Sequence, residues 1–398
     1  MLLYSAGSVG AGAFYAFNNF VLPPILKSFG APDLLTGLLA STRSIEGTVI
    51  QPTVGAISDR TWTRIGRRRP FIVVAIPLSA AFFVLSALAN DLLLLAIGIV
   101  LFSIFFNIAV DPYAALLPDI SPPKQRGLLS GIANGIQLAS QVAFLVAAML
   151  LIAGGAAPLW LYVLTAAILL VGFGVTAATI AEPRELTAHV EHMPFRMYLD
   201  ALLTNQPALR YLVTVFVYQF GFSAVQPYLT LFLTTDIGMS EDEALGIAAL
   251  ALLVTGLGAV GFGKLADRVG HRMVLAIGWS LLAVGAVSGT VIHGIPQTVA
   301  VAILVGVGNG AATAVKWPLL TLLIPPEKTG VYAGLIAAAD SVAIPLSVGV
   351  AAIAFLPVFG YRGIFAMLAV FIVLAVALLL LLVRVPRPSE IAAVQVAQ

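Results

Sequence analysis

The stretch GAISDRTWTRIGRRRPF, residues Gly55 to Phe71, places five arginines in one short turn. The chain around it has 398 residues, of which 60% are hydrophobic and only 10% are charged. Soluble proteins average about 45–50% apolar and about 25% charged residues. The net charge is only +2, which argues against a basic nucleic-acid-binding protein. Such a cluster in so apolar a chain is typical of a loop that fixes the orientation of a membrane protein.

Apolar runs separated by charged residues, prolines or glycines indicate an all-α polytopic membrane protein. Several of these runs approach or exceed the ~20 residues that a helix needs to cross a bilayer. The chain divides into twelve expected transmembrane helices, at 2–26, 34–57, 70–89, 91–118, 128–153, 157–181, 207–234, 242–263, 272–292, 296–323, 330–356 and 360–384. The first run is not expected to be a cleavable signal peptide, because polar Asn18 and Asn19 interrupt it and no basic segment precedes it.

The distribution of positive charge fits a cell-membrane protein with both termini in the cytoplasm. In that arrangement the inside loops hold all Lys and Arg residues except Lys27, Arg43, Lys316 and Arg362. Such an excess of inside charge is the usual determinant of topology. The polar stretch 182–206 then becomes a cytoplasmic linker between an N-terminal six-helix bundle, 1–181, and a C-terminal bundle, 207–384, with a cytoplasmic tail at 385–398.

Two segments of the first half recur in the second half. GKLADRVGHR, 263–272, repeats the glycine, aspartate and arginine spacing of the loop that begins at Gly55. SPPKQRGLLSG, 121–131, matches IPPEKTGVYAG, 324–334. Two halves in the same orientation form a parallel repeat, and this arrangement with its loop signature resembles the major facilitator superfamily (MFS). The expected fold is therefore the MFS fold, in which two six-helix bundles are related by pseudo-twofold symmetry.

The repeated loop is expected to act as a gate as well as an orientation anchor. Asp59 and Asp267 lie at helix C-termini, where the helix dipole disfavours a negative charge, so each needs a cationic or helix N-terminal partner. Asp119 is an expected partner of the arginine cluster. The expected gating residues are Asp59, Arg60, Gly66, Arg67, Asp119, Asp267 and Arg268.

A longer string narrows the resemblance. VIQPTVGAISDRTWTRIGRRRPF, 49–71, preceded by GAPDLLTGLLAS, 30–41, resembles sucrose transporters and their relatives in the glycoside–pentoside–hexuronide:cation symporter group. The resemblance covers roughly the first third of the chain and implies cation-coupled sugar uptake. Melibiose-type members carry two cation-binding acids where this chain has Gly47 and Gln51. Sodium coupling through that site is therefore not expected.

Five ionisable residues lie inside expected helices. A charge at membrane depth costs at least ~2.5–3.5 kcal/mol on insertion scales, so each of these residues should face a partner or a wet cavity. Asp111 and Lys316 are expected to form a central pair, and Arg43 and Glu46 a network with Asp340. Asp111, Glu46, Arg43 and Asp340 are the proton-coupling candidates, with Asp111 first and Glu46 second. The alternative for each is a purely structural ion pair.

Amides and one indole complete the expected solute site. Asn134, Gln137 and Gln141 form a polar stripe with helical spacing, and Gln219 and Gln226 lie two turns apart. Amides both donate and accept hydrogen bonds, which suits a polyhydroxylated ligand. The alternative is hydrogen bonding between helices. The expected solute contacts are Asn18, Asn19, Asp111, Asn134, Gln137, Gln141, Gln219, Gln226, Asn309, Lys316 and Trp317.

The sequence is compatible with three functional classes. A proton-coupled symporter of a small polar solute, such as a sugar or glycoside, is favoured. The alternatives are an exporter of amphiphilic compounds by proton antiport and a non-transporting membrane protein with the same fold. An enzyme is not expected, because the sequence shows neither a nucleotide-binding motif nor any cysteine. We expect a monomer with the bilayer, a solute and H⁺ as partners, and no nucleic acid, cofactor or metal.

Overall fold

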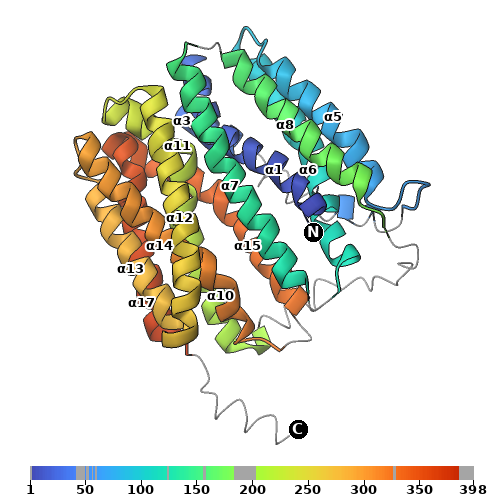
Figure 1. The fold of residues 1–398 in the computed structure, drawn as a ribbon. Helices are drawn as coiled ribbons and strands as arrows, with labels where there is room; N and C mark the ends of the chain where they lie inside the picture. The colour runs from blue at the N-terminus through green and yellow to red at the C-terminus, as the bar shows by residue number, and fades with distance from the viewer. Residues whose placement is uncertain are drawn as a thin grey trace, which may run out of the picture. The chain divides into compact units, whose positions relative to one another are not determined.

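The computed structural model describes residues 2–41, 50, 53–55, 57–58, 61–122, 125–155, 158–182, 203–325 and 329–384. These residues are almost entirely helical (Figure 1). In the first half the helices are α1 (Leu2–Ala16), η1 (Phe17–Val21), α2 (Leu22–Ser28), α3 (Asp33–Ala40), α5 (Arg69–Ser86), α6 (Leu92–Ile120), α7 (Arg126–Ala153) and α8 (Pro158–Thr179). In the second half they are α10 (Gln206–Ser223), α11 (Val225–Leu231), η3 (Phe232–Asp236), α12 (Glu241–Val269), α13 (His271–Gly289), α14 (Ile295–Thr321), α15 (Thr329–Val350), η5 (Ala351–Phe355), α16 (Leu356–Phe359), η6 (Gly360–Arg362) and α17 (Gly363–Leu382).

Within the described ranges, 10 helical stretches are long and apolar enough to cross a membrane. The expected helix 34–57 is not among them, because most of its residues beyond Ser41 lie outside the description. The expected helices 330–356 and 360–384 fall in one continuous stretch, Gly334–Leu382. The prediction of an all-α polytopic membrane protein is confirmed.

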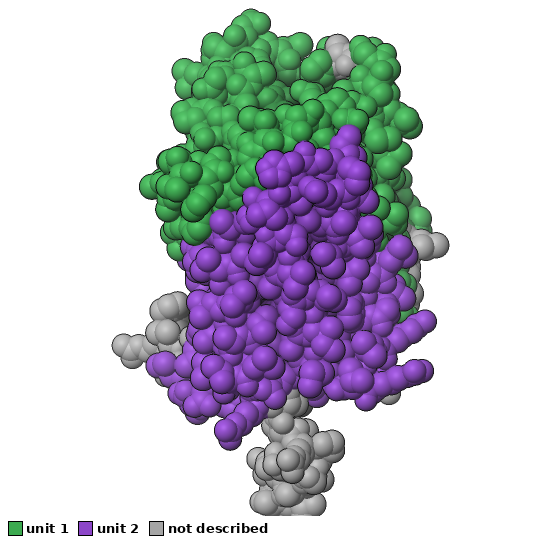
Figure 2. Space-filling model, turned by 90° about the vertical axis from the view of Figure 1, so that its left-hand side faces the viewer, with its two compact units in different colours: residues 1–191, 224–253, 344–364 green, residues 192–223, 254–343, 365–398 purple. Residues whose placement is uncertain are grey.

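The chain forms two compact units that differ from the two sequence halves (Figure 2). The first unit contains 1–191 together with two pieces of the second half, 224–253 and 344–364. The second unit contains 192–223, 254–343 and 365–398. The two pieces join the first unit because they pack on helices of the first half, as described below. The division into bundles at 1–181 and 207–384 remains a prediction from the repeat.

An aromatic cluster forms the centre of the first unit. Phe83 of α5 lies between Phe17, Phe102 and Tyr162, with ring centroids 4.8, 4.7 and 4.9 Å away. Its side chain is only 1% exposed. Aromatic pairs at such distances add to the stabilisation by apolar burial. The cluster therefore ties α5 to η1, α6 and α8.

In the described part of the chain, short π-helical turns interrupt two long helical stretches, and a proline lies two residues after each of these turns. η1 is followed by Pro23, and η5 by Pro357. Proline has no backbone N–H, so the carbonyl four residues earlier loses its usual helical donor and the helix widens locally. Such turns occur frequently at functional sites. In η1 the turn places Asn18 and Asn19 at the middle of the first membrane-spanning stretch, Leu3–Ser28.

The second unit is held by close helix packing. A Cβ added to Gly278 of α13 would lie 2.1 Å from Cβ of Ala311 in α14. Small residues at such contacts let membrane helices approach closely, which strengthens van der Waals packing. Trp279, the next residue of α13, is fully buried and stacks on Tyr218 of α10 with ring centroids 4.8 Å apart. These contacts fix three helices around the polar groups described below.

The aromatic cluster leads to a stability prediction. Replacing Phe83 with alanine should lower the unfolding free energy by about 3–5 kcal/mol, the usual cost of a large cavity. Thermal unfolding of the detergent-purified protein measures this. Val74 of the same helix is 62% exposed in the described structure, so Val74→Ala is the matched control and should change stability little. Equal melting temperatures for the two variants would contradict the central role of the cluster.

Candidate functional site

The arginine loop of the first half is held by Asp119 at the end of α6. The Asp119 carboxylate accepts hydrogen bonds from Arg67 Nη2 at 2.8 Å and from Arg68 Nε at 3.3 Å. Arg67 and Arg68 are each only 6% exposed. A buried guanidinium needs such a partner, because an unpaired buried charge is strongly unfavourable. The contact between Asp119 and the arginine cluster that the sequence predicted is therefore present.

A second carboxylate, which the sequence analysis assigned to the linker, also binds this loop. Glu182, which follows α8, accepts hydrogen bonds from the backbone N–H groups of Arg67, Arg68 and Arg69 at 2.8–3.1 Å. These groups lie at the start of α5, where the helix dipole favours a negative charge. Gly66 adopts φ +124°, and a Cβ there would lie 2.6 Å from Glu182 Oε1. Glycine is thus required for the close approach of the carboxylate.

The second copy of the loop has related geometry. Gly270, the counterpart of Gly66, also has a positive φ, +91°. In the first half, Arg69 Nε donates to the Ala177 carbonyl oxygen at 2.6 Å, and in the second half Arg272 Nη2 donates to the Leu380 carbonyl oxygen at 2.7 Å. Each half therefore ties its loop to its last long helix through an arginine. Asp267 and Arg268 are exposed, and their gating role remains a prediction.

At the opposite end of the first unit, Asp33 joins segments that are far apart in the sequence. Its carboxylate forms an ion pair with Lys27 at 2.7 Å and accepts a hydrogen bond from the Tyr361 hydroxyl at 2.7 Å. Its carbonyl oxygen accepts a hydrogen bond from the Tyr228 hydroxyl at 2.9 Å. Tyr361 and Tyr228 come from the second half of the chain. We call Lys27, Asp33, Tyr228 and Tyr361 the Asp33 cluster.

Gly37, one turn after Asp33, permits this contact. A Cβ at Gly37 would lie 2.2 Å from the Tyr228 hydroxyl and 2.3 Å from Cγ1 of Val348. Real Cβ atoms essentially never approach other atoms so closely. Any other residue at this position would separate α3 from the helix pieces that carry Tyr228 and Val348.

Three of the predicted solute contacts lie near the Asp33 cluster. Asn19 Nδ2 donates to Gln226 Oε1 at 3.3 Å, which connects η1 with α11. Asn18 is buried, and its amide donates to the Ala40 carbonyl oxygen at the end of α3. The structure thus brings Asn18, Asn19 and Gln226 together. Their hydrogen bonds connect the first half of the chain to a helix of the second half.

The other predicted residues of the first unit are more dispersed. Along α7, Asn134 is exposed, and Gln137 and Gln141 are half-buried. Asp111 is half-buried in α6. Asp111 and Lys316 belong to different units, and their pairing remains a prediction.

In the second unit, Lys316 of α14 has a different carboxylate as its neighbour. Lys316 Nζ lies 4.0 Å from Oδ2 of Asp340 in α15, and both side chains are mostly buried. The ammonium group also lies 5.9 Å from the centroid of the Tyr218 ring, within range of a cation–π interaction. The other Asp340 oxygen, Oδ1, is buried and has no hydrogen-bond partner among the described residues.

Further polar groups surround this ion pair. The Tyr218 hydroxyl donates to Asn309 Oδ1 at 2.8 Å, and Tyr211 donates to the Lys316 carbonyl oxygen at 2.6 Å. Gln219 is instead bonded to Ser223 on its own helix at 3.1 Å, and Trp317 is 40% exposed. We call Lys316, Asp340, Tyr218 and Asn309 the ion-pair site.

Some predicted residues lie outside the described ones, namely Arg43, Glu46, Asp59 and Arg60. Glu182, Asp33 and Tyr361 are not among the residues expected from the sequence. The two acids could have been found, because an acidic residue next to a helix end often binds a cation or a helix N-terminus. Across the described part of the chain, no group of His, Asp or Glu side chains is arranged to hold a metal ion.

Comparison with known proteins now decides the family. The model of the Major Facilitator Superfamily matches residues 4–207 and 211–397. The chain belongs to the major facilitator superfamily. A solved D-xylose-proton symporter has the same fold, with a TM-score of 0.77, and a solved nucleoside transporter has a TM-score of 0.76. The symporter is 17% identical, and the match covers 96% of this chain and 97% of that one. This superfamily protein is thus a multi-pass membrane transporter.

Sequence relatives include sugar transporters. The human proton-associated sugar transporter A is 34% identical over 145 residues, which are 30% of this chain and 19% of the relative. A rice sucrose transport protein is 37% identical over 73 residues, 18% of this chain and 14% of the relative. The match therefore spans less than a fifth of either relative. An efflux pump homologue from Lactococcus lactis is 22% identical over 334 residues, 79% of each chain.

Glu182 generates a prediction for this transporter. Glu182→Ala removes the acceptor of three backbone N–H groups and should lower the unfolding free energy by about 1.5–3 kcal/mol, the usual value for hydrogen bonds to a charged group. Glu182→Gln keeps an acceptor and should lose less. Thermal unfolding measures both variants. Wild-type stability in Glu182→Ala would show that the carboxylate does not hold the loop.

Gly37 generates a second prediction. The chain contains no cysteine, so a single reporter, Ala40→Cys, can be labelled directly with a membrane-impermeant maleimide. Ala40 is only 4% exposed. Gly37→Val should increase the labelling rate of this reporter on the order of tenfold, which corresponds to a loss of about 1.4 kcal/mol in the packing of α3 against Tyr228 and Val348.

Gly174 of α8 provides the control, since a Cβ there meets no atom within 4 Å. Gly174→Val, combined with the same reporter, should leave the labelling rate unchanged. Equal labelling rates for Gly37→Val and Gly174→Val would show that the contact at Gly37 does not keep α3 packed against Tyr228 and Val348.

Proposed function

We propose that this transporter carries a small polar solute, a sugar or glycoside, together with a proton, by alternating access. The observation that carries the proposal is the ion pair between Lys316 and Asp340, 4.0 Å apart within membrane-spanning helices. Ionisable residues at membrane depth are costly and usually mark ion or proton pathways. A carboxylate that is either paired with a lysine or protonated can carry H⁺ across the membrane.

The geometry of the ion-pair site favours Asp340 as the proton carrier, ahead of the sequence preference for Asp111 and Glu46. At 4.0 Å the pair is longer than a direct charge-assisted hydrogen bond of about 2.7–2.9 Å. Within the described structure, Asp340 Oδ1 is buried with no hydrogen-bond partner, which disfavours a permanent negative charge. Protonation would neutralise Asp340 and free Lys316, and the ammonium group could then contact a solute hydroxyl.

Amide groups and aromatic rings of the two units suit a polyhydroxylated solute. In the first unit, Asn19 and Gln226 present donors and acceptors from two helices. In the second unit, Asn309 and Tyr218 do the same beside Lys316. Each of these groups has a hydrogen-bonding partner within the protein, so a solute would exchange those bonds for bonds to its own hydroxyl groups.

Two clusters at opposite ends of the first unit are the proposed gates. The Asp33 cluster would close the external side, and the arginine loop with Asp119 and Glu182 would regulate the cytoplasmic side. This orientation follows from the excess of positive charge in the loops on the arginine side. We place the protein in the cell membrane, with both termini in the cytoplasm, acting as a monomer.

Export of amphiphilic compounds by proton antiport is the second candidate. It is favoured by the efflux pump homologue, whose match covers 79% of each chain, more than the match to either sugar transporter relative. The two functions differ in the solute and in the direction of movement relative to the proton.

Transport in liposomes tests the proposal. A thermal-shift screen of mono- and disaccharides identifies a ligand, and purified protein in liposomes is then given that sugar with an alkaline interior. We expect faster uptake with the pH gradient than without it. Uptake at the same rate with and without the gradient would contradict proton coupling. Movement of amphiphilic compounds against the direction of proton flow would favour the exporter.

Asp340→Asn should separate transport from coupling. The variant removes the titratable carboxylate, so it should lose accumulation driven by the pH gradient while it retains exchange of labelled sugar across the membrane. Asp242 is a carboxylate at the start of α12. The control variant Asp242→Asn should accumulate sugar like the wild type. Undiminished accumulation by Asp340→Asn would exclude Asp340 as the proton carrier.

A further inference from the structure

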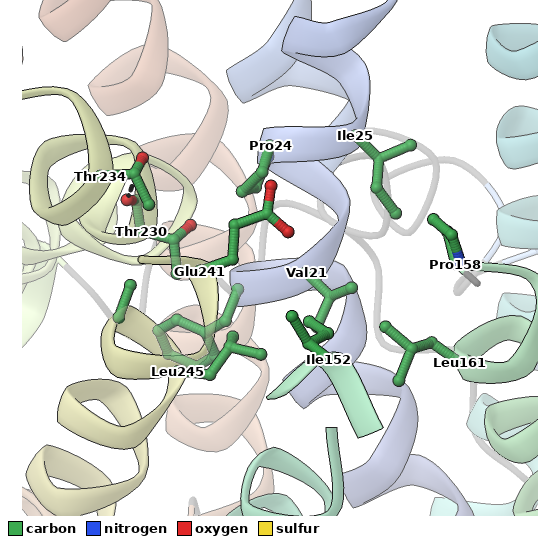
Figure 3. Close-up of a pocket in the computed structure, with 12 residues that line it drawn as sticks. Val21, Pro24, Ile25, Ile152, Pro158, Leu161, Thr230, Thr234, Glu241 and Leu245 are labelled. Atoms are coloured by element: carbon green, nitrogen blue, oxygen red, sulfur yellow. Dashed lines mark hydrogen bonds between the residues drawn. The ribbon is translucent and has the colours of Figure 1, made fainter. Parts of the chain in front are cut away.

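A cavity of about 240 Å³ lies in the first unit, and none of its lining residues belongs to the ion-pair site (Figure 3). Apolar side chains form most of its wall. They come from the first membrane-spanning stretch, from the end of α7, and from α8 and α12, and include Phe20, Val21, Ile25, Ile152, Leu161 and Leu245. Its polar groups lie together on one side, from Thr230, Thr234 and Glu241. Lys and Arg are absent from the described residues that line it.

The Glu241 carboxylate is not needed to cap its helix. At the start of α12 the Ser240 N–H donates to Glu243 Oε2 at 3.0 Å, which is one of the two bonds of a capping box, so Glu243 is the carboxylate that caps this helix. Glu241 is next to this box and makes no hydrogen bond or ion pair with another described residue. Figure 3 shows its carboxylate pointing into the cavity, toward the segment with Val21 and Pro24. It therefore supplies an uncommitted negative charge.

The two threonines make the polar side of the cavity rich in acceptors. Thr234 Oγ1 donates its only proton to the Thr230 carbonyl oxygen at 2.9 Å, so this hydroxyl can only accept from a ligand. Thr230 is 1% exposed, and its own hydroxyl has no partner among the described residues. A buried hydroxyl without a partner is unfavourable. A ligand that donates hydrogen bonds would match the accepting Thr234 hydroxyl and the Glu241 carboxylate.

We propose that this cavity binds the primary ammonium group of an amphiphile, with its apolar part along the wall. A protonated amine offers three donors and one positive charge, which match the Glu241 carboxylate and the accepting Thr234 hydroxyl. The volume is slightly below the ~300 Å³ of small drug sites, so the cavity suits one short apolar arm. The site does not depend on the transported solute.

Free amines and aminophospholipids share this chemistry. A lipid such as phosphatidylethanolamine carries a primary ammonium group beside apolar chains, and 2-phenylethylammonium carries the same group on a single ring. Both would place nitrogen between Glu241 and the threonines. The test below includes one arm for each source.

Calorimetric titration of the full-length protein in phosphatidylcholine nanodiscs with 2-phenylethylammonium chloride tests the site. We expect saturable binding that Glu241→Gln weakens about fivefold, as for one partly exposed charge pair. Asp242→Asn removes the same charge from the same helical turn outside the cavity and should leave affinity unchanged. The neutral 2-phenylethanol, and the trimethylated ammonium that lacks N–H donors, should both bind more weakly.

A second arm uses nanodiscs that also contain phosphatidylethanolamine. If the wild type binds the probe more weakly in these discs than in phosphatidylcholine discs, and Glu241→Gln does not, the lipid occupies the site. If binding by the wild type is the same in both kinds of disc, the site is assigned to a free amine. Either result supports an ammonium site. Absence of saturable binding, equal effects of Glu241→Gln and Asp242→Asn, or equal affinity for 2-phenylethanol would overturn it.

Discussion

A charge within a membrane-spanning helix requires a partner, and this requirement organises the structure. Lys316 and Asp340 are placed on neighbouring helices, and Tyr218 lies beneath the ammonium group. At the helix ends, Asp119 neutralises Arg67 and Arg68 in the same way. The difference between the two sites is in their geometry. The Asp119 contact is short and shared by two arginines, whereas the Lys316 contact is long and leaves one carboxylate oxygen without a hydrogen bond among the described residues. The first arrangement stabilises a fold, and the second leaves room for a proton.

We propose that contacts between distant segments close the protein at one end. Asp33 is bonded to tyrosines from two elements of the second half, and Gly37 allows these elements to approach. Hydrogen bonds and van der Waals contacts of this kind are individually weak, so a transporter can break them within its cycle. Glu182 differs, because its carboxylate is bound by three backbone N–H groups of one helix start. That contact keeps the loop attached to its own half.

The sequence predicts the helices well, because each expected span is a long apolar run bounded by polar residues. It also predicts the contact of Asp119 with the arginines, since all of these residues lie at helix ends that are expected on the cytoplasmic side of the first half. From the sequence, Lys316 is expected to pair with Asp111, whereas in the described structure its neighbour is Asp340. A spacing rule cannot show which of several acids within the helices faces a given lysine. Tyr361 and Asp33 are 328 residues apart, so only the packed structure reveals their contact. Glu182 was assigned to the linker because its local sequence is polar, and its role depends on the position of α5.

We propose that protonation of Asp340 replaces its ion pair with Lys316 when the solute binds. Proton uptake during solute binding is the direct measurement of this step. Purified protein is mixed with its sugar in weakly buffered solution near neutral pH, and a pH indicator reports the protons taken up. We expect uptake of about one proton per sugar bound by the wild type and none by Asp340→Asn. Sugar binding without proton uptake by the wild type would contradict it.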